Sequence, residues 1–222
     1  PAGSGAISPV RGQTEASPII TALGPEFHVV GGAKLRSAGR AALGVEVAIM
    51  DKDDVELPRG EVGEICARGP NVMLGYWGME QASAETLRSG WLHTGDLGYM
   101  DEDGFVFIVD RAKDMIISGG ENIFSVEVEG AIYSHPSVRE CAVVGIPHDE
   151  WGEMVHAIVV LKEGHGLNEG ELLAHCRALI AGYKLPRSIE FRSEPLPVSG
   201  AGKILKNELR KPYWESKDRG VN

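Results

Sequence analysis

The 222-residue chain is long enough for one large or two small domains, each with its own core. Its formal net charge of −10 argues against non-specific binding to nucleic acid, because a surface that neutralises phosphates needs clustered Lys and Arg. No apolar run approaches the roughly 18 residues of a spanning helix, and no signal-peptide pattern opens the sequence. We therefore expect a cytoplasmic protein without an integral membrane segment.

The first half of the chain predicts short strands separated by Gly, Pro and Asp turns. Residues 45–49 alternate apolar and polar side chains, residues 60–67 alternate loosely, and residues 105–109 follow an Asp-Gly turn. We expect a β-rich lobe over about residues 37–109.

The second half mixes helix and strand signals. Ser125 is placed to cap a helix, and Asn168 with Glu171 is a capping-box signature before an apolar helical face. Expected buried strands and a last short helix follow in the order 141–146, 155–161, 188–191 and 206–211. The sequence thus predicts an α+β fold, with a β-rich lobe followed by a small α+β domain that has a roughly three-stranded sheet.

Cysteine and tryptophan positions carry a structural interpretation. Cys66, Cys141 and Cys176 are odd in number, widely spaced and without a Cys-x-x-Cys pair. This pattern favours reduced, buried thiols over a disulfide framework or a zinc site. Trp77 and Trp91 are expected to pack inside the lobe.

Lys203 is the candidate catalytic cation. It lies in Pro-Val-Ser-Gly-Ala-Gly-Lys-Ile, whose glycines would let a lone ammonium reach an anionic centre. The run is not a P-loop, because Pro197 and Ile204 stand where that pattern needs Gly and Ser or Thr. A lysine that merely closes a surface turn is the alternative.

Further motifs join this lysine in a fixed order along the chain. The first two are Gln-Thr-Glu at residues 13–15 and Gly-Glu-Ile-Cys-Ala-Arg-Gly-Pro at 63–70. The next two are Gly-Trp-Leu-His-Thr-Gly-Asp-Leu-Gly at 90–98 and Asp-Arg-Ala-Lys-Asp-Met-Ile-Ile-Ser-Gly-Gly-Glu-Asn-Ile at 110–123. Together they resemble the adenylate-forming superfamily, also called AMP-binding enzymes, and most closely its fatty-acyl and aryl-acyl CoA ligases. The resemblance runs from about Arg11 to about Trp214.

The resemblance implies a division of the chain into three parts. Residues 1–36 would be a remnant of the large N-terminal AMP-binding domain, residues 37–112 its β-rich distal lobe, and residues 113–222 a mobile C-terminal α+β domain. The family's Ser/Thr/Gly-rich phosphate loop ending in Lys-Gly does not occur here, and Pro-Val-Arg at residues 9–11 stands where the family usually has an aromatic residue before the Gly of the Gln-Thr-Glu segment. We therefore expect residues 1–10 to be a truncated, processed or displaced remnant, and the chain alone to be inactive.

The implied chemistry has two steps. A carboxylic acid attacks the α-phosphorus of ATP to give an acyl-adenylate and pyrophosphate, and the thiol of coenzyme A then displaces AMP. Lys203 would bridge the carboxylate and the α-phosphate in the first step, and Lys113 would be the hinge about which the C-terminal domain turns. A plain solvated linker is the alternative interpretation of residues 110–114.

The resemblance also assigns the nucleotide and its metal. Asp96 would accept both ribose hydroxyls, since a carboxylate offers two acceptor oxygens. Arg111 would reach the same ribose, Thr14 would bind the α-phosphate, and Glu15 would bind Mg²⁺, which prefers hard oxygen ligands.

Three glycines have assigned roles through the resemblance. Gly12 would line the acyl pocket, while Gly119 and Gly120 would form a turn that leaves room for the pantetheine arm. A plain hairpin turn is the alternative for the paired glycines.

Other functions remain open at this stage. A peptide-synthetase adenylation domain is one, and a truncated fragment without catalysis, which only associates with a partner, is the other. The sequence leaves the identity of the acid and the oligomeric state open, a homodimer included.

Overall fold

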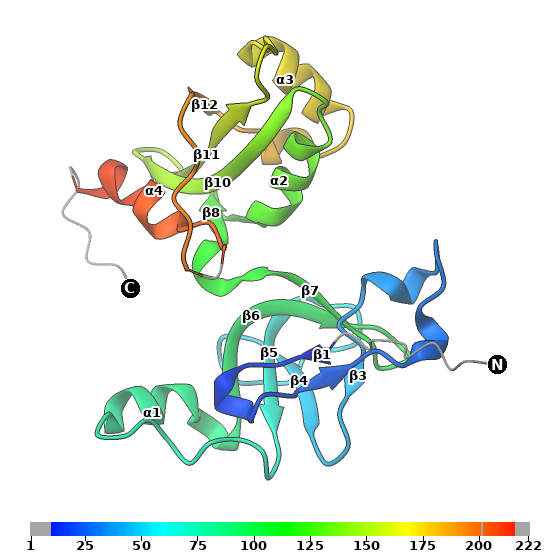
Figure 1. Cartoon of the computed structure of the whole chain (residues 1–222). Coiled ribbons are helices and arrows are strands. Elements are labelled where there is room, and N and C mark those ends of the chain that lie inside the picture. Colours follow the sequence, from blue (N-terminus) through cyan, green and yellow to red (C-terminus); the bar gives the residue numbers. More distant parts are fainter. Residues whose placement is uncertain (1–9, 201, 216–222) are drawn as a thin grey trace. The chain divides into compact units, whose positions relative to one another are not determined.

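The computed structural model describes residues 10–200 and 202–215, in two compact units, Pro1–Ala112 and Lys113–Asn222. Figure 1 shows that both units combine sheets with short helices, which makes the fold α+β as expected. Residues 1–9 of the segment 1–10 that we expected to be truncated, processed or displaced lie outside the described residues.

The first unit is built on antiparallel strands. Its main sheet has four, in the order β4 (Glu46–Met50), β5 (Gly63–Arg68), β6 (Leu92–Met100) and β7 (Val106–Arg111). A smaller sheet pairs β1 (Val10–Arg11), β2 (Thr21–Ala22) and β3 (Arg40–Ala41). One α-helix, α1 (Glu80–Thr86), and the 3-10 turns Thr14–Ala16, Pro25–Phe27, Ala33–Arg36 and Arg88–Gly90 fill the connections.

The second unit contains a five-stranded sheet with helices, not the roughly three-stranded sheet that the sequence predicted. The hairpin of β8 (Ile116–Ser118) and β9 (Glu121–Ile123) leads into α2 (Ser125–Tyr133), and β10 (Val138–His148) pairs with β11 (Gly152–Leu161). Then follow α3 (Glu169–Arg177), β12 (Ser188–Arg192), which is parallel to β11, and α4 (Lys206–Trp214). The 3-10 turns Ala112–Asp114 and Gly182–Lys184 complete the element order.

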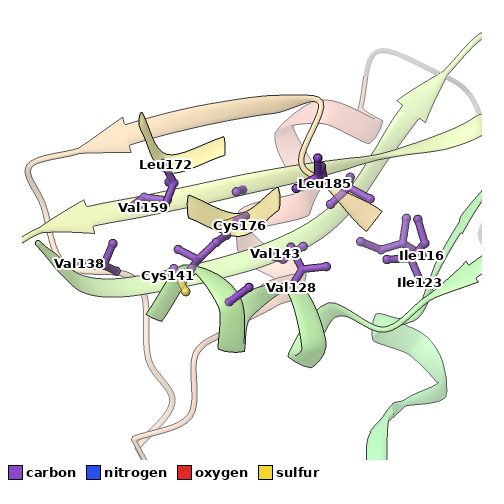
Figure 2. Packing of buried hydrophobic residues seen from close by; sticks show 14 residues of the cluster. Ile116, Ile123, Val128, Val138, Cys141, Val143, Val159, Leu172, Cys176 and Leu185 are labelled. Atoms are coloured by element: carbon purple, nitrogen blue, oxygen red, sulfur yellow. The ribbon is translucent and has the colours of Figure 1, made fainter. Parts of the chain in front are cut away.

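Alternation along β10 and β11 divides the core of the second unit into two layers. Val143 and Val159 belong to the cluster that contains Leu172 of α3 and Val128 of α2, shown in Figure 2. Their neighbours Val144 and Ile158 belong to a second cluster with Leu209 of α4. Successive strand residues point to opposite faces. The strands are therefore apolar on both sides, which is why residues 141–146 and 155–161 lack polar alternation.

Several expectations about local structure are confirmed and two are wrong. Asn168 forms the capping box with Glu171, and all three cysteines are free and buried. Ser125 does not cap α2, because Phe124 is the N-cap residue and the Ser125 hydroxyl accepts from Lys206 instead. Trp77 is fully exposed rather than packed in the lobe. No helix among the described residues is long and apolar enough to cross a membrane.

Candidate functional site

Asp96 lies on β6, where the Thr-Gly-Asp motif forms part of a strand beside a register shift rather than a free turn. Its side chain is nearly buried. The carboxylate forms ion pairs with Arg11 and, at 4.0 Å, with Arg111 directly across the sheet on β7. Burial and then the charge of Arg111 lower the pKa of Arg11. The structure thus brings the predicted Asp96 and Arg111 together. It adds Arg11, whose contact with Asp96 no local sequence pattern indicates.

Glu64 of β5 supports this strand from the neighbouring position. One carboxylate oxygen accepts from the Gly95 amide at 2.9 Å, and the other contacts His93 Nδ1 at 2.8 Å and Arg88 at 3.1 Å. These contacts fix the backbone on both sides of Thr94, whose hydroxyl donates to the Ile65 carbonyl at 2.6 Å. The position of Asp96 is therefore set by a charged network.

The Glu64, Cys66 and His93 side chains are close enough together to be considered as a metal site, since their ligand atoms lie within 4.8 Å of one another. The pKa of Cys66 is raised to about 12 by burial, then by Glu64, so the thiol is protonated at neutral pH. Both Glu64 oxygens already accept hydrogen bonds.

The Gln-Thr-Glu motif forms a 3-10 turn, Thr14–Ala16. Thr14 is exposed and Glu15 half-buried. One Glu15 oxygen accepts from the Tyr76 hydroxyl at 2.9 Å, and burial followed by this hydrogen bond raises the pKa of Tyr76. The second oxygen of the same carboxylate is a hard ligand of the kind that Mg²⁺ takes, so Glu15 fits the role expected of it.

Gly12 precedes this turn and is required by backbone packing. A Cβ atom at this position would overlap the carbonyl oxygen of Pro18. The conformation of the motif therefore depends on a missing side chain, whether or not the glycine also lines an acyl pocket.

Gly119 and Gly120 form the two-residue turn between β8 and β9. Their φ angles of 62° and 88° match a type I′ turn, which L-residues with side chains adopt at a cost. The Gly119 amide donates to the Trp151 carbonyl at 3.0 Å. The hairpin interpretation is therefore correct as structure, and a pantetheine-facing role remains a prediction.

Lys113 is exposed and begins the second unit, within the short 3-10 turn Ala112–Asp114. Its carbonyl accepts from Arg210 of α4 at 3.2 Å. This hydrogen bond connects the first residue of the second unit to its last helix.

Lys203 lies near the tip of an ordered hairpin. Val198 and Ile204 form an antiparallel bridge, and the Ser199 amide donates to the Lys203 carbonyl at 2.8 Å. The Ser199 hydroxyl accepts from the Lys203 amide at 3.2 Å. The side chain is exposed, and no residue within the described ranges 10–200 and 202–215 pairs with its ammonium group. The cation is thus available to a ligand.

Comparison with known proteins identifies the family of the chain. The family described as AMP-binding enzyme matches residues 3–77, and the AMP-binding enzyme C-terminal domain matches residues 127–203. A feruloyl-CoA synthase of Amycolatopsis sp is 48% identical over 202 residues, which cover 91% of this chain and 40% of the relative. A long-chain-fatty-acid–CoA ligase of Escherichia coli is 44% identical over 90% of this chain and 34% of its own length.

Solved structures show the same relationship. The o-succinylbenzoate coenzyme A synthetase MenE of Bacillus subtilis, in complex with ATP and a magnesium ion, superposes with a TM-score of 0.81. It is 40% identical, and the match covers 91% of this chain and 41% of MenE. The chain therefore spans well under half the length of the relatives it matches. On its motifs, its fold and these matches, the chain belongs to the adenylate-forming, or AMP-binding, enzyme superfamily.

Proposed function

We propose that this chain forms part of an AMP-forming acid–thiol ligase, which activates a carboxylic acid with ATP and transfers the acyl group to coenzyme A. The observation that carries the proposal is the exposed ammonium of Lys203, which no residue in the described part of the chain pairs with, on the hairpin that Val198 and Ile204 close. The attack of a carboxylate on the α-phosphate concentrates negative charge at one centre. A placed cation stabilises such a transition state by about 3 kcal/mol.

The first unit supplies the proposed nucleotide contacts. Asp96 would bind the ribose hydroxyls with Arg111 beside it, Thr14 would contact the α-phosphate, and Glu15 would hold Mg²⁺. The ion pairs of Asp96 support this role, because nearby cations favour the ionised form of a carboxyl group, which can accept two hydrogen bonds. Gly12 would line the acyl pocket.

The second unit supplies the proposed moving parts. Lys113 would be the hinge, and Gly119 and Gly120 would pass the pantetheine arm of coenzyme A after rotation. Hinges need only a few residues that absorb changes in φ and ψ, and Lys113 is exposed in a short turn at the first residue of its unit.

Substrate class follows from the named relatives. We propose an aromatic or fatty acid, because the relatives act on ferulate and long-chain fatty acids according to their names. We also propose a cytoplasmic location, where ATP and coenzyme A are available.

The test is ATP–pyrophosphate exchange by the full gene product, with aromatic, fatty and amino acids supplied in turn, followed by detection of the CoA thioester. We expect exchange with an aromatic or fatty acid and a thioester product. Exchange with an amino acid and no thioester would favour a peptide-synthetase domain, and no exchange with any acid would contradict the proposal. The 222-residue chain alone is the matched control, with little exchange expected, because the family's phosphate loop is absent from its sequence.

A further inference from the structure

Two lysines three residues apart occupy opposite environments in the second unit. Lys203 is exposed, whereas the Lys206 side chain is only 15% exposed. The Lys206 ammonium donates to the Ser125 hydroxyl at 2.7 Å and pairs with Glu129 Oε1, also at 2.7 Å. The segment therefore contains one available cation and one that is fully used inside the protein.

The partners of Lys206 belong to rigid elements. Ser125 and Glu129 lie one turn apart on α2. Glu129 Oε1 also accepts from the Val143 amide of β10 at 2.8 Å, and β10 is the edge strand of its sheet. Lys206 is the first residue of α4, so this ion pair joins α4, α2 and the sheet edge at one point.

Apolar packing alone leaves the start of α4 less well defined. Leu209 is buried in the second core cluster, and Ile204 and Tyr213 pack against it. Such contacts hold the helix to the sheet, but they are not directional. A hydrogen-bonded charge pair is directional, and its best-attested use is to fix register.

The spacing connects this anchor to the catalytic lysine. Three residues of chain span at most about 11 Å, so fixing Lys206 limits where the Lys203 backbone can lie. Below the tip, the hairpin is closed by the bridge of Val198 with Ile204 and by the Leu205 amide, which donates to the Pro197 carbonyl at 2.8 Å. Lys203, Ile204 and Leu205 are thus each tied by a backbone contact to the facing strand of the hairpin, and Lys206 follows directly.

We infer that Lys206, held by Ser125 and Glu129, is a positioning residue for the adenylation step, and that it acts by fixing the hairpin that presents Lys203. The inference rests on the proposed function for its catalytic consequence. Its structural part stands on the contacts of the second unit alone.

The structural part is tested by amide hydrogen exchange on the 222-residue chain. In Lys206→Met we expect exchange at Ser199, Gly202 and Lys203 to rise at least tenfold, while amides within β11 stay protected. Lys211→Met is the matched control, because Lys211 lies on the same helix in an exposed pair with Glu215 at 3.5 Å. Unchanged exchange at the hairpin in Lys206→Met would overturn the inference whatever the protein's activity.

The catalytic part is tested by separating the half-reactions in the full gene product. We expect Lys206→Met to lower ATP–pyrophosphate exchange at least tenfold and to change thioester formation from a supplied acyl-adenylate less than threefold. Lys206→Arg should restore most of the exchange, since arginine keeps the charge. Adding Lys206→Met to Lys203→Ala should cost little more, because both changes remove the same contribution.

Other results would distinguish a positioning role of Lys206 from a role in stability alone. Equal loss in both half-reactions would mean that Lys206 serves only stability, and the positioning role would be rejected. If Lys206→Met does not fold, Ser125→Ala removes one hydrogen bond without stranding a charge, and the same split at a smaller size is expected. A full-length wild type without exchange would contradict the proposed function, while the amide exchange result would still decide the structural part.

Discussion

The ion pair between Arg11 and Asp96 yields a prediction that the chain itself can test. Asp96 has a side chain that is 11% exposed, and Arg11 has one that is 33% exposed. Asp96→Asn keeps the shape of the side chain and removes its charge. The arginine then stays partly buried beside Arg111, without the carboxylate that both of them face.

The expected cost lies between two limits. Breaking a fully buried pair costs about 3–5 kcal/mol, and an exposed pair contributes about 1 kcal/mol or less. Because Arg11 is one-third exposed, we expect about 2 kcal/mol for this pair. For a unit of about 110 residues this lowers the melting temperature by about 8 °C.

A double-mutant cycle measures the coupling directly. Thermal unfolding of Asp96→Asn, Arg11→Met and the double variant should give a coupling energy of about 2 kcal/mol between the two sites. The second unit, which does not contain the pair, is the internal control, and its transition should not move. Additive effects, or a loss equal in both units, would refute the reasoning that this pair stabilises the first unit.

Three further predictions concern the second unit. Lys203→Ala should lower ATP–pyrophosphate exchange of the full gene product about 150-fold, from about 3 kcal/mol of lost stabilisation, and leave the melting temperature unchanged, because the side chain is exposed. Lys113→Pro should impair thioester formation more than adenylation, and equal loss in both steps would count against rotation. Burial, the largest influence, lowers the pKa of His156 despite Glu190, so the folded state binds its proton less readily than the unfolded state. Urea unfolding should therefore show stability that is present above about pH 6.5 and lost as the pH falls below it, and His156→Gln should flatten this dependence.

Short sequence patterns correctly predicted a helix cap and two buried strands. The capping box of Asn168 and Glu171 is a contact across three residues, and the apolar strands at residues 141–146 and 155–161 follow from burial on both faces. The prediction that Ser125 caps a helix was wrong, and its hydroxyl instead accepts a hydrogen bond from Lys206, which is 81 residues away. A local capping pattern contains no information about a hydrogen-bond donor that only the tertiary fold brings close.

The candidate site divides in the same way. Asp96 and Lys203 are candidates from sequence because their motifs are continuous along the chain. Their supports were missed, since the Gly95 amide is held by Glu64 from a neighbouring strand and Arg11 reaches Asp96 from a different sheet. Both contacts join residues far apart in the sequence, so neither periodicity nor motif spacing indicates them.

Lys203 and Lys206 illustrate the difference between a residue that a motif indicates and a residue that supports it through distant contacts. The proposed reactive lysine, Lys203, is exposed, so its own side-chain contacts contribute little to its placement. The position of the Lys203 backbone then depends on neighbouring residues that are held inside the protein. Lys206 is such a residue, because its ammonium group has two partners at 2.7 Å. Replacing the neighbour should therefore reduce the first chemical step while the reactive lysine is still present, which separates placement from chemistry in a single protein.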